Sequence, residues 1–212
     1  MPNRNRPDRR RMKFGRIQPN PRFAEFQETI AAHPEWLKPW EGTFFRFQSI
    51  SFPNPKDVLS GQGARDRGGR WNAPGLATLY GSTTDTTALE ESKANDRYYG
   101  VETKGPRLLV AVEARVVAML DLTASVIRRT LGVTLNELAA EDWRKLLQSG
   151  MESASQALGR AAATNGASGV LVRSAAVPRA SNVVVFPGAH RADRLAVIEG
   201  DKLTRLGVRL RA

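Results

Sequence analysis

The sequence predicts an α+β domain with largely antiparallel β-sheets. Segments with the apolar content of strands are mixed with segments of helical periodicity, and the two kinds do not alternate steadily along the chain. A doubly wound parallel sheet would need that steady alternation. The chain has 212 residues, which is enough for one substantial domain with an appendage and short for two domains.

The overall composition is typical of a soluble folded protein. Hydrophobic residues make up 41% and charged residues 25% of the chain. No window approaches about eighteen consecutive apolar residues, and the N-terminus has no apolar signal-peptide core. Cysteine is absent, so thiolate zinc ligands and a thiol nucleophile are excluded. We expect a cytoplasmic protein that does not enter a membrane.

The positive charge is concentrated at the N-terminus. Residues 1–22 contain eight arginine or lysine residues and only Asp8 as an acid, so they carry +7 of the formal net charge of +11. This segment is rich in Pro, Asn and Arg and cannot bury enough apolar surface to fold by itself. We therefore predict a flexible, basic N-terminal arm over 1–22. A nucleic-acid-binding arm is the alternative, and a transit peptide is disfavoured because amphipathic spacing is lacking.

The next part of the chain predicts a helix and two strands. Apolar residues recur at helical spacing over 23–32, within a helical lead-in that we assign to 23–42. The segment TFFRFQ (43–48) is rich in aromatic residues, as strands are. A glycine-rich, charged loop follows over 60–75, and ATLYG (77–81) is a second strand.

Capping signals mark the helices of the remaining chain. Thr87 and Glu90 fit a capping box, and so do Thr134 and Glu137 ahead of a helix with apolar residues up to Leu147. An alanine-rich helix covers 151–165 and ends at a glycine. The further strand candidates are 107–114, 116–121, 169–174, 181–187 and 195–200.

Several common catalytic and nucleotide-binding motifs are missing. The only histidines, His33 and His190, have no metal-ligand spacing, so no metal site is expected. No GxSxG elbow is present for a Ser-His-Asp triad. The pair Gly61-x-Gly63 is completed neither to a dinucleotide fingerprint nor to a P-loop.

Two arginines stand out as candidate anion ligands. Arg46 interrupts an aromatic strand, where a buried guanidinium needs an anionic or carbonyl partner because an unpaired buried charge is costly. An ordinary strand arginine that snorkels to the surface or forms an ion pair is the alternative. Arg70 lies in the glycine-rich loop, where backbone N–H groups can also face an anion. Together the two would suit a phosphate or pyrophosphate group.

Other polar residues occupy positions that are ordinary when taken singly. Tyr80 ends a strand, where its ring either lines a cleft or belongs to the core. Glu90 and Glu91 fall early in a helix, where an acid is favoured by the helix dipole. Ser174 and Asn182 lie at the end and the start of neighbouring strand candidates.

The order of these segments resembles the RES domain. The resemblance is carried by FFRFQS around Arg46, GGRWNAPG (68–75) with a following LY, TALEES around Glu91, and VRSAAVPRASNVVVFP from Ser174 to Asn182. It assigns 43–212 to a RES-like catalytic domain and implies a fold like that of ADP-ribosyltransferases. The family's activity implies a bacterial toxin that consumes NAD by cleaving its nicotinamide–ribose bond.

The resemblance also assigns roles to residues. Those implied to be catalytic are Arg46, Glu91 and Ser174, and those implied to bind NAD are Arg46, Phe47, Arg70, Tyr80 and Asn182. Glu91 is chosen over Glu90 because it lies eleven residues after Tyr80, the usual family spacing. Phe47 departs from the pattern, in which a tyrosine commonly follows the arginine. Trp71 is left out because a core position is as compatible with the pattern as ligand contact.

The implied chemistry is physically consistent with these residue types. Loss of nicotinamide creates an oxocarbenium-like ribosyl cation, which a carboxylate such as that of Glu91 can stabilise. The cationic nicotinamide ring can lie on an aromatic ring such as that of Tyr80, while Arg46 holds the pyrophosphate. NAD is then a substrate and no other cofactor is expected. The family implies a helical antitoxin as partner, and a homo-oligomer is left open.

Three functions remain open at this point. The first is an NAD-depleting toxin, either an NAD glycohydrolase or an NAD phosphorylase. The second is a mono-ADP-ribosyltransferase that modifies a protein. The third, from a different class, is a nucleic-acid-binding protein that acts through the basic arm.

Overall fold

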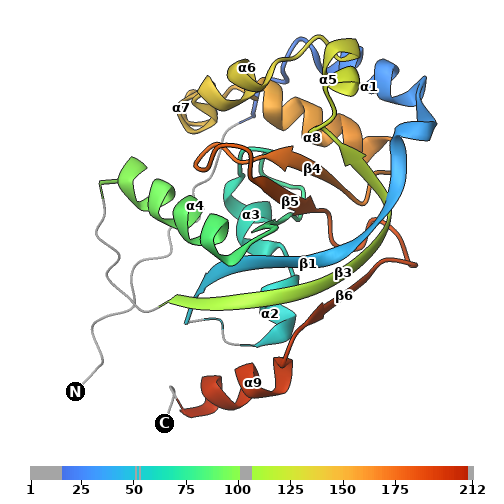
Figure 1. The fold of residues 1–212 in the computed structure, drawn as a ribbon. Coiled ribbons are helices and arrows are strands. Elements are labelled where there is room, and N and C mark those ends of the chain that lie inside the picture. Colours follow the sequence, from blue (N-terminus) through green and yellow to red (C-terminus); the bar gives the residue numbers. More distant parts are fainter. Residues whose placement is uncertain (1–15, 51, 53, 101–106, 210–212) are drawn as a thin grey trace.

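The computed structural model describes residues 16–50, 52, 54–100 and 107–209, which form the mixed α and β fold shown in Figure 1. The strands are β1 (Leu37–Ser49), β2 (Leu79–Ser82), β3 (Arg107–Asp121), β4 (Gly169–Arg173), β5 (Ser181–Val185) and β6 (Arg194–Val197). The helices are α1 (Phe23–Ala31), α2 (Pro55–Leu59), α3 (Gln62–Arg67), α4 (Asp85–Tyr98), α5 (Ser125–Thr130), α6 (Leu135–Ala140), α7 (Trp143–Gln148), α8 (Ala154–Thr164) and α9 (Gly200–Arg209), with a 3-10 turn, η1 (Pro34–Trp36).

The sheet is largely antiparallel, as predicted, and it closes on itself. The strand order is β1-β2-β5-β4-β3, and β3 pairs in turn with β1, while β6 lies against β3. Only the pairing of β3 with β4 is parallel. The closed sheet is a small barrel in which each strand from β1 to β5 has a neighbouring strand on both sides.

β1 and β3 are longer than the sequence predicts. They pair from Leu37↔Leu120 to Ser49↔Arg107, so the lead-in is helical only as far as Trp36. The register shifts between Lys38 and Trp40. Such an irregularity accommodates Pro39, which has no N–H for the ladder. The candidates 107–114 and 116–121 form one continuous strand because β1 supplies a partner along its whole length.

β1 and β2 are held together at a single pair of residues. Phe45 and Ser82 are the only partners in their ladder, whereas β2 pairs with β5 at four positions. β1 continues beyond Phe45 to Ser49 beside β3, so the end of β1 separates from β2. The sheet is therefore split at this point.

Two apolar clusters hold the fold together. One lies between the sheet and the helices α1, α5, α6 and α8, and includes Phe26, Leu120 and Leu158. The other includes Phe44 and Val183 on the opposite face of the strands, where α2 and α9 pack. In Figure 1 the first group of helices lies above the sheet and α2 and α9 lie below it.

The alanine-rich helix forms as predicted, as α8. Ser153 and Gln156 make a capping box at its start, and the chain leaves it at Gly166, which has a positive φ of 82°. Buried alanines on its surface allow close packing against α1 and the sheet. The predicted capping box of Thr134 and Glu137 is also confirmed.

Some local predictions are wrong. Thr84, and not Thr87, caps α4, because the Thr87 N–H donates to Thr84 Oγ1 over 3.1 Å. The helix expected after Thr134 is two short helices, since Asp142 caps a new one, α7. The short helices α2 and α3, part of which fall in the expected loop, and also α5 and α9 were not predicted. Each of α2, α3 and α5 has only five or six residues, too few to show a clear period.

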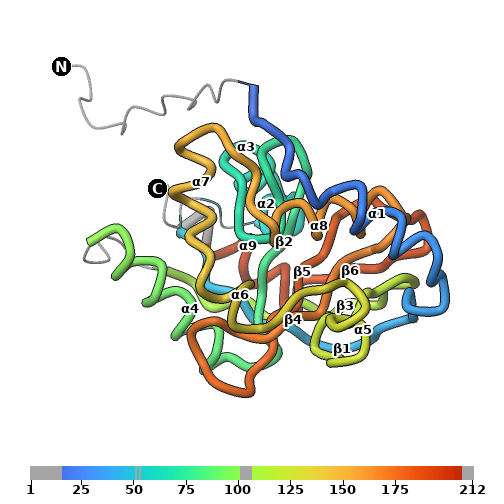
Figure 2. The backbone as a smooth tube through the Cα atoms, turned by 90° about the horizontal axis from the view of Figure 1, so that it is seen from above, coloured from blue at the N-terminus to red at the C-terminus, as the bar shows by residue number. Residues whose placement is uncertain are grey.

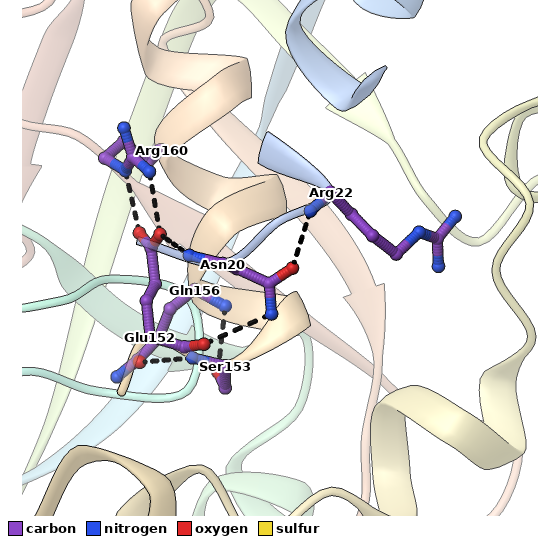
Figure 3. Close-up of polar contacts among 6 residues, drawn as sticks. All are labelled: Asn20, Arg22, Glu152, Ser153, Gln156 and Arg160. Atoms are coloured by element: carbon purple, nitrogen blue, oxygen red, sulfur yellow. Dashed lines mark hydrogen bonds and ion pairs between the residues drawn. The ribbon is translucent and has the colours of Figure 1, made fainter. Parts of the chain in front are cut away.

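The described part of the N-terminal arm is bound to the domain. Gln18 makes a parallel bridge to Met151, and the Asn20 N–H donates to Glu152 Oε2 over 3.0 Å. Arg160 donates two hydrogen bonds of 2.7 Å to the same carboxylate, as Figure 3 shows. Residues 1–15 lie outside the described residues, so flexibility of the arm remains a prediction for them.

Candidate active site

A cleft of about 660 Å³ opens where β1 separates from β2. Its walls come from β1, β2 and α4, from the helices α2 and α3, and from the segment around Arg70. Of the residues that the sequence assigned to a site, the following line it: Arg46, Phe47, Arg70, Tyr80, Glu91 and Asn182. These residues come from distant parts of the chain, and one cavity unites them.

The carboxylate of Glu91 is held by two donors. Ser174 Oγ and Asn182 Nδ2 each donate to Glu91 Oε1 over 2.6 Å. The Ser174 oxygen in turn accepts from the N–H groups of Ala176 and Val177. Because these N–H groups use the lone pairs of the hydroxyl, its proton is directed at Glu91. Ser174 therefore orients the carboxylate and acts as a positioning residue.

Ser82 is a member of this network that the sequence did not predict. Its hydroxyl donates to Asn182 Oδ1 over 2.7 Å, and the two residues are register partners on β2 and β5. This bond fixes the amide of Asn182 so that its nitrogen faces Glu91. Ser82 lies two positions after Tyr80 on the same strand, a spacing that places both side chains on one face.

Arg46 is a buried cation without an acidic partner. Its Nη1 donates to the carbonyl of Val58 over 3.0 Å, while its Nε is buried and has no hydrogen bond. Among the described residues no carboxylate lies within ion-pair distance of it. Burial lowers the pKa of Arg46 to about 10, so the group keeps its charge at neutral pH. The carbonyl partner is confirmed, and the ion-paired alternative is wrong.

Arg70 reaches across to the end of α6. Its Nη1 donates to the carbonyl oxygens of Leu138 (2.6 Å) and Glu141 (3.2 Å). Burial and the nearby Arg144 lower the pKa of Arg70. The guanidinium therefore ties the glycine-rich segment to a helix while it also lines the cleft.

Trp71 belongs mainly to the core. It is 5% exposed and packs in the cluster beneath the helices, although a part of it borders the cleft. Of the two interpretations of this tryptophan that the sequence left open, the core position is the one observed.

Tyr80 both packs against the core and lines the cleft, the two positions between which the sequence did not decide. Its hydroxyl accepts from the Trp71 N–H over 2.9 Å and donates to Asn72 Oδ1 over 2.7 Å, while the ring borders the cleft. Burial raises the pKa of this phenol, so it remains a neutral donor. The buried Asn72 amide then donates to three backbone carbonyls of its own loop, those of Ala64, Ala73 and Leu76.

The glycine at position 69 is required by this contact. A Cβ there would lie 2.5 Å from the Tyr80 hydroxyl oxygen, which is closer than side-chain carbon atoms approach a packed neighbour. On the other side, Gln156 Nε2 of α8 donates to the Gly69 carbonyl over 2.9 Å. The segment around Gly69 is therefore held rigidly between β2 and α8.

Glu90 lies beside Glu91 in sequence but takes no part in the network. Its carboxylate pairs with Lys93 over 2.8 Å at the surface. The hydrogen bond from Lys93 lowers the pKa of Glu90. Of the two glutamates, Glu91 lines the cleft and Glu90 does not, while the catalytic role of Glu91 stays a prediction.

The cleft carries a net positive charge. Six arginines of the described chain line it, with Arg67, Arg107, Arg144 and Arg173 in addition to the two already named, against the carboxylates of Asp57 and Glu91. Such a lining favours an anionic ligand. Within the described residues no group of three His, Cys, Asp or Glu side chains could hold a metal ion. No helix in that part of the chain is long and apolar enough to cross a membrane.

A cationic cleft with one firmly oriented carboxylate defines the class of protein as an enzyme that acts on an anionic substrate. The model of the RES domain family matches residues 44–206, and the chain belongs to this family. It is 30% identical over 144 residues to the NAD(+) phosphorylase MbcT of Mycobacterium tuberculosis (strain H37Rv) and to that of Mycobacterium bovis. Each alignment covers 64% of this chain and 69% of the relative.

A solved structure has the same fold. It is the crystal structure of the M. tuberculosis MbcT–MbcA toxin–antitoxin complex, with a TM-score of 0.64 and 24% sequence identity. The superposed region covers 86% of this chain and 97% of that chain.

Proposed function

We propose that this protein is a RES-domain toxin that depletes NAD by cleaving the nicotinamide–ribose bond, with inorganic phosphate as acceptor. The observation that carries the proposal is the Glu91 carboxylate, which Ser174 and Asn182 hold at the wall of an arginine-rich cleft. The acceptor is suggested by the phosphorylase name of the relatives that are 30% identical.

The reaction breaks the bond between the ribose C1 atom and the pyridinium nitrogen. The bonding electrons leave with nicotinamide, which becomes neutral, and the ribosyl carbon becomes cationic. A phosphate oxygen then forms a bond to this carbon and yields ADP-ribose 1-phosphate. Glu91 stabilises the cation or orients the ribose hydroxyls, and it forms no covalent bond itself.

The remaining side chains bind the substrate. Arg46 lines the cleft as a cation with no acidic partner among the described residues, and it holds the diphosphate together with Arg70. The Tyr80 ring accepts the cationic nicotinamide by a cation–π contact worth about 0.5 to 2 kcal/mol. Phe47 lines the same cavity as an apolar wall, so binding there uses no hydroxyl from this position. NAD is the substrate, and no metal or further cofactor takes part.

The proposal also covers the fold class, the protein partner and the cellular site of action. The closed sheet with an arginine on its first strand and a glutamate on the helix after the second supports an ADP-ribosyltransferase-like architecture. An antitoxin partner is supported by the likeness of the fold to a toxin solved with its antitoxin, and its helical nature and its place over the cleft are part of the proposal. The site of action would be the cytoplasm, where NAD and the antitoxin are present. We leave a homo-oligomer open.

Nicotinamide release from NAD, measured with and without inorganic phosphate, tests the reaction. We expect release that depends on phosphate and a loss on the order of 10²-fold in Glu91→Gln, the scale of a positioned catalytic group. Glu90→Gln is the matched control and should retain activity, because Glu90 faces solvent. Full turnover in Glu91→Gln would refute the site.

A second candidate keeps the site and changes the acceptor. Transfer of ADP-ribose to a protein would use the same carboxylate and cleft, and mass spectrometry of modified lysate proteins distinguishes it from phosphorolysis. The nucleic-acid hypothesis depends on the basic arm, of which residues 1–15 lie outside the described residues.

A further inference from the structure

One face of α4 lines the cleft. Glu91, Asn95 and Tyr98 follow at intervals of four and three residues, so they share a helix face, and all three line the cavity. A rise of about 1.5 Å per residue separates Glu91 from Tyr98 by roughly 10 Å along the helix. The cleft therefore has a second end, distant from the carboxylate network.

The Tyr98 ring is held in place at this end although it is exposed. Tyr98 is 44% exposed, and its hydroxyl donates to the Asp142 carboxylate over 3.0 Å. The guanidinium of Arg144 covers the ring at 4.5 Å from its centre. The views in Figures 1 and 2 agree that α4 and α7, which carry these residues, lie at the same end of the molecule. A rigid, accessible aromatic ring results.

Arg144 is itself built into the wall of the cleft. Its guanidinium carbon lies 4.4 Å from the ring centre of Trp143, and its Nη2 donates to Asn95 Oδ1 over 2.7 Å. Its Nε is buried without a hydrogen bond. Since Asn95 lies between Glu91 and Tyr98 on α4, its contact with Arg144 places positive charge between the two ends of the cleft.

We propose that Tyr98 is the stacking platform for the purine base of the dinucleotide substrate. This inference rests on the proposed function and adds a specificity-determining residue to it. In NAD a diphosphate and two riboses separate the scissile bond from the base, and the cleft repeats that order: carboxylate, guanidinium groups, then a planar ring. A base that stacks on the ring would cover its exposed face, while Arg144 backs the ring.

The test compares NAD with nicotinamide mononucleotide, which keeps the scissile bond and lacks the adenosine. Removal of an aromatic ring on which a base stacks lowers the affinity for that base by at least about 5-fold. We expect kcat/KM for NAD to fall by at least about that factor in Tyr98→Ala, with no change for nicotinamide mononucleotide. Tyr98→Phe should retain activity on NAD, because it keeps the ring.

Tyr99 provides the matched control. It is adjacent, 53% exposed and does not line the cleft, and its ring packs edge-on against that of Tyr98 with 5.2 Å between the ring centres. Tyr99→Phe keeps this contact and should leave turnover of NAD unchanged. Equal losses for both substrates in Tyr98→Ala, or no loss for NAD, would overturn the inference.

Binding of AMP, measured by calorimetry, separates this inference from the proposed function. AMP carries the purine base without the reacting group, so its affinity should fall at least about 5-fold in Tyr98→Ala and stay constant in Tyr99→Phe. This result would support the platform even in a protein that releases no nicotinamide. Equal AMP affinity in the wild type and in Tyr98→Ala would overturn it.

Discussion

Glu91 is the residue on which the polar side chains of the cleft converge. Two donors from β5 and from the end of β4 meet at one of its oxygens, and each donor is fixed by bonds of its own. Charge-assisted hydrogen bonds of this kind are stronger than neutral ones and hold a carboxylate in one orientation. Catalysis depends on such preorganisation more than on the mere presence of an acid.

The first prediction at this scale concerns Ser174. Ser174→Ala removes a donor to Glu91 and leaves the cleft lining intact, so we expect kcat for nicotinamide release to fall by roughly 10-fold or more while KM for NAD changes little. Ser82→Ala should show the same pattern more weakly, since Ser82 acts through Asn182. An increase in KM alone would mean that Ser174 binds substrate directly.

The second prediction concerns Arg46. An unpaired buried cation costs folding free energy, as its lowered pKa indicates, and an apolar side chain of similar length avoids that cost. Arg46→Met should therefore unfold at a temperature equal to or above that of the wild type. KM for NAD should rise at least about 10-fold, because the diphosphate loses a charge-assisted partner. A clear drop in melting temperature would show that Arg46 is structural.

The loop from Gly68 to Gly75 shows how one element serves another. Tyr80 of β2 and Gln156 of α8 hold its backbone from two sides, and Asn72 bonds it internally. These hydrogen bonds hold the glycine-rich loop in a single conformation. This rigidity lets Arg70 and the Tyr80 ring form a fixed wall of the cleft.

The prediction at the scale of elements concerns Gly159, where α8 touches this loop. A Cβ at Gly159 would lie 1.9 Å from the Trp71 carbonyl oxygen, so Gly159→Ala must push the helix and the loop apart. We expect a loss of about 1 to 3 kcal/mol of unfolding free energy. Thermal unfolding should show this as a drop of several degrees, at roughly 2 to 4 °C per kcal/mol.

Gly63→Ala in α3 is the control, since the new Cβ meets only the flexible end of Arg67 at 3.1 Å. Its melting temperature should not fall, because alanine favours a helix over glycine. Equal melting temperatures for the Gly159 variant and the wild type would contradict the tight contact.

At the scale of the whole molecule, the closed sheet and its single split create the site. β1 pairs with β3 along its entire length but with β2 only at Phe45 and Ser82. The cavity opens at this split, and α4 packs against β1 beside it. The N-terminal segment is bound on the far side of α8, where Glu152 joins Asn20 and Arg160 (Figure 3).

The last prediction tests that attachment by truncation. Removal of residues 1–15 should leave the melting temperature unchanged, whereas removal of 1–21 also deletes the bonds of Gln18 and Asn20. A few hydrogen bonds of about 0.5 to 1.5 kcal/mol each would then be lost, with a drop of several degrees in melting temperature. Equal melting temperatures for the two truncations would mean that the contacts of 18–20 contribute nothing to stability.

Much of the fold and of the site could be predicted from the sequence. Apolar periodicity predicted α1, alanine content and a closing glycine predicted α8, and aromatic or apolar runs predicted most strands, because all these signals are local. The motif segments predicted six residues that line one cleft. The short helices α2, α3 and α5 and the break between α6 and α7 were not predicted, because caps such as Asp142 outweigh a period over so few residues.

Residue types and their spacing along the chain were sufficient for the family, the antiparallel class and the choice of Glu91. What they left undecided was every contact between residues far apart: that Ser82 turns Asn182, that Arg46 has a carbonyl and no acid, that Arg70 reaches α6, and that Trp71 is core. Such contacts arise when strands pair and helices pack across some hundred residues, and a pattern with a period of a few residues carries no information about them.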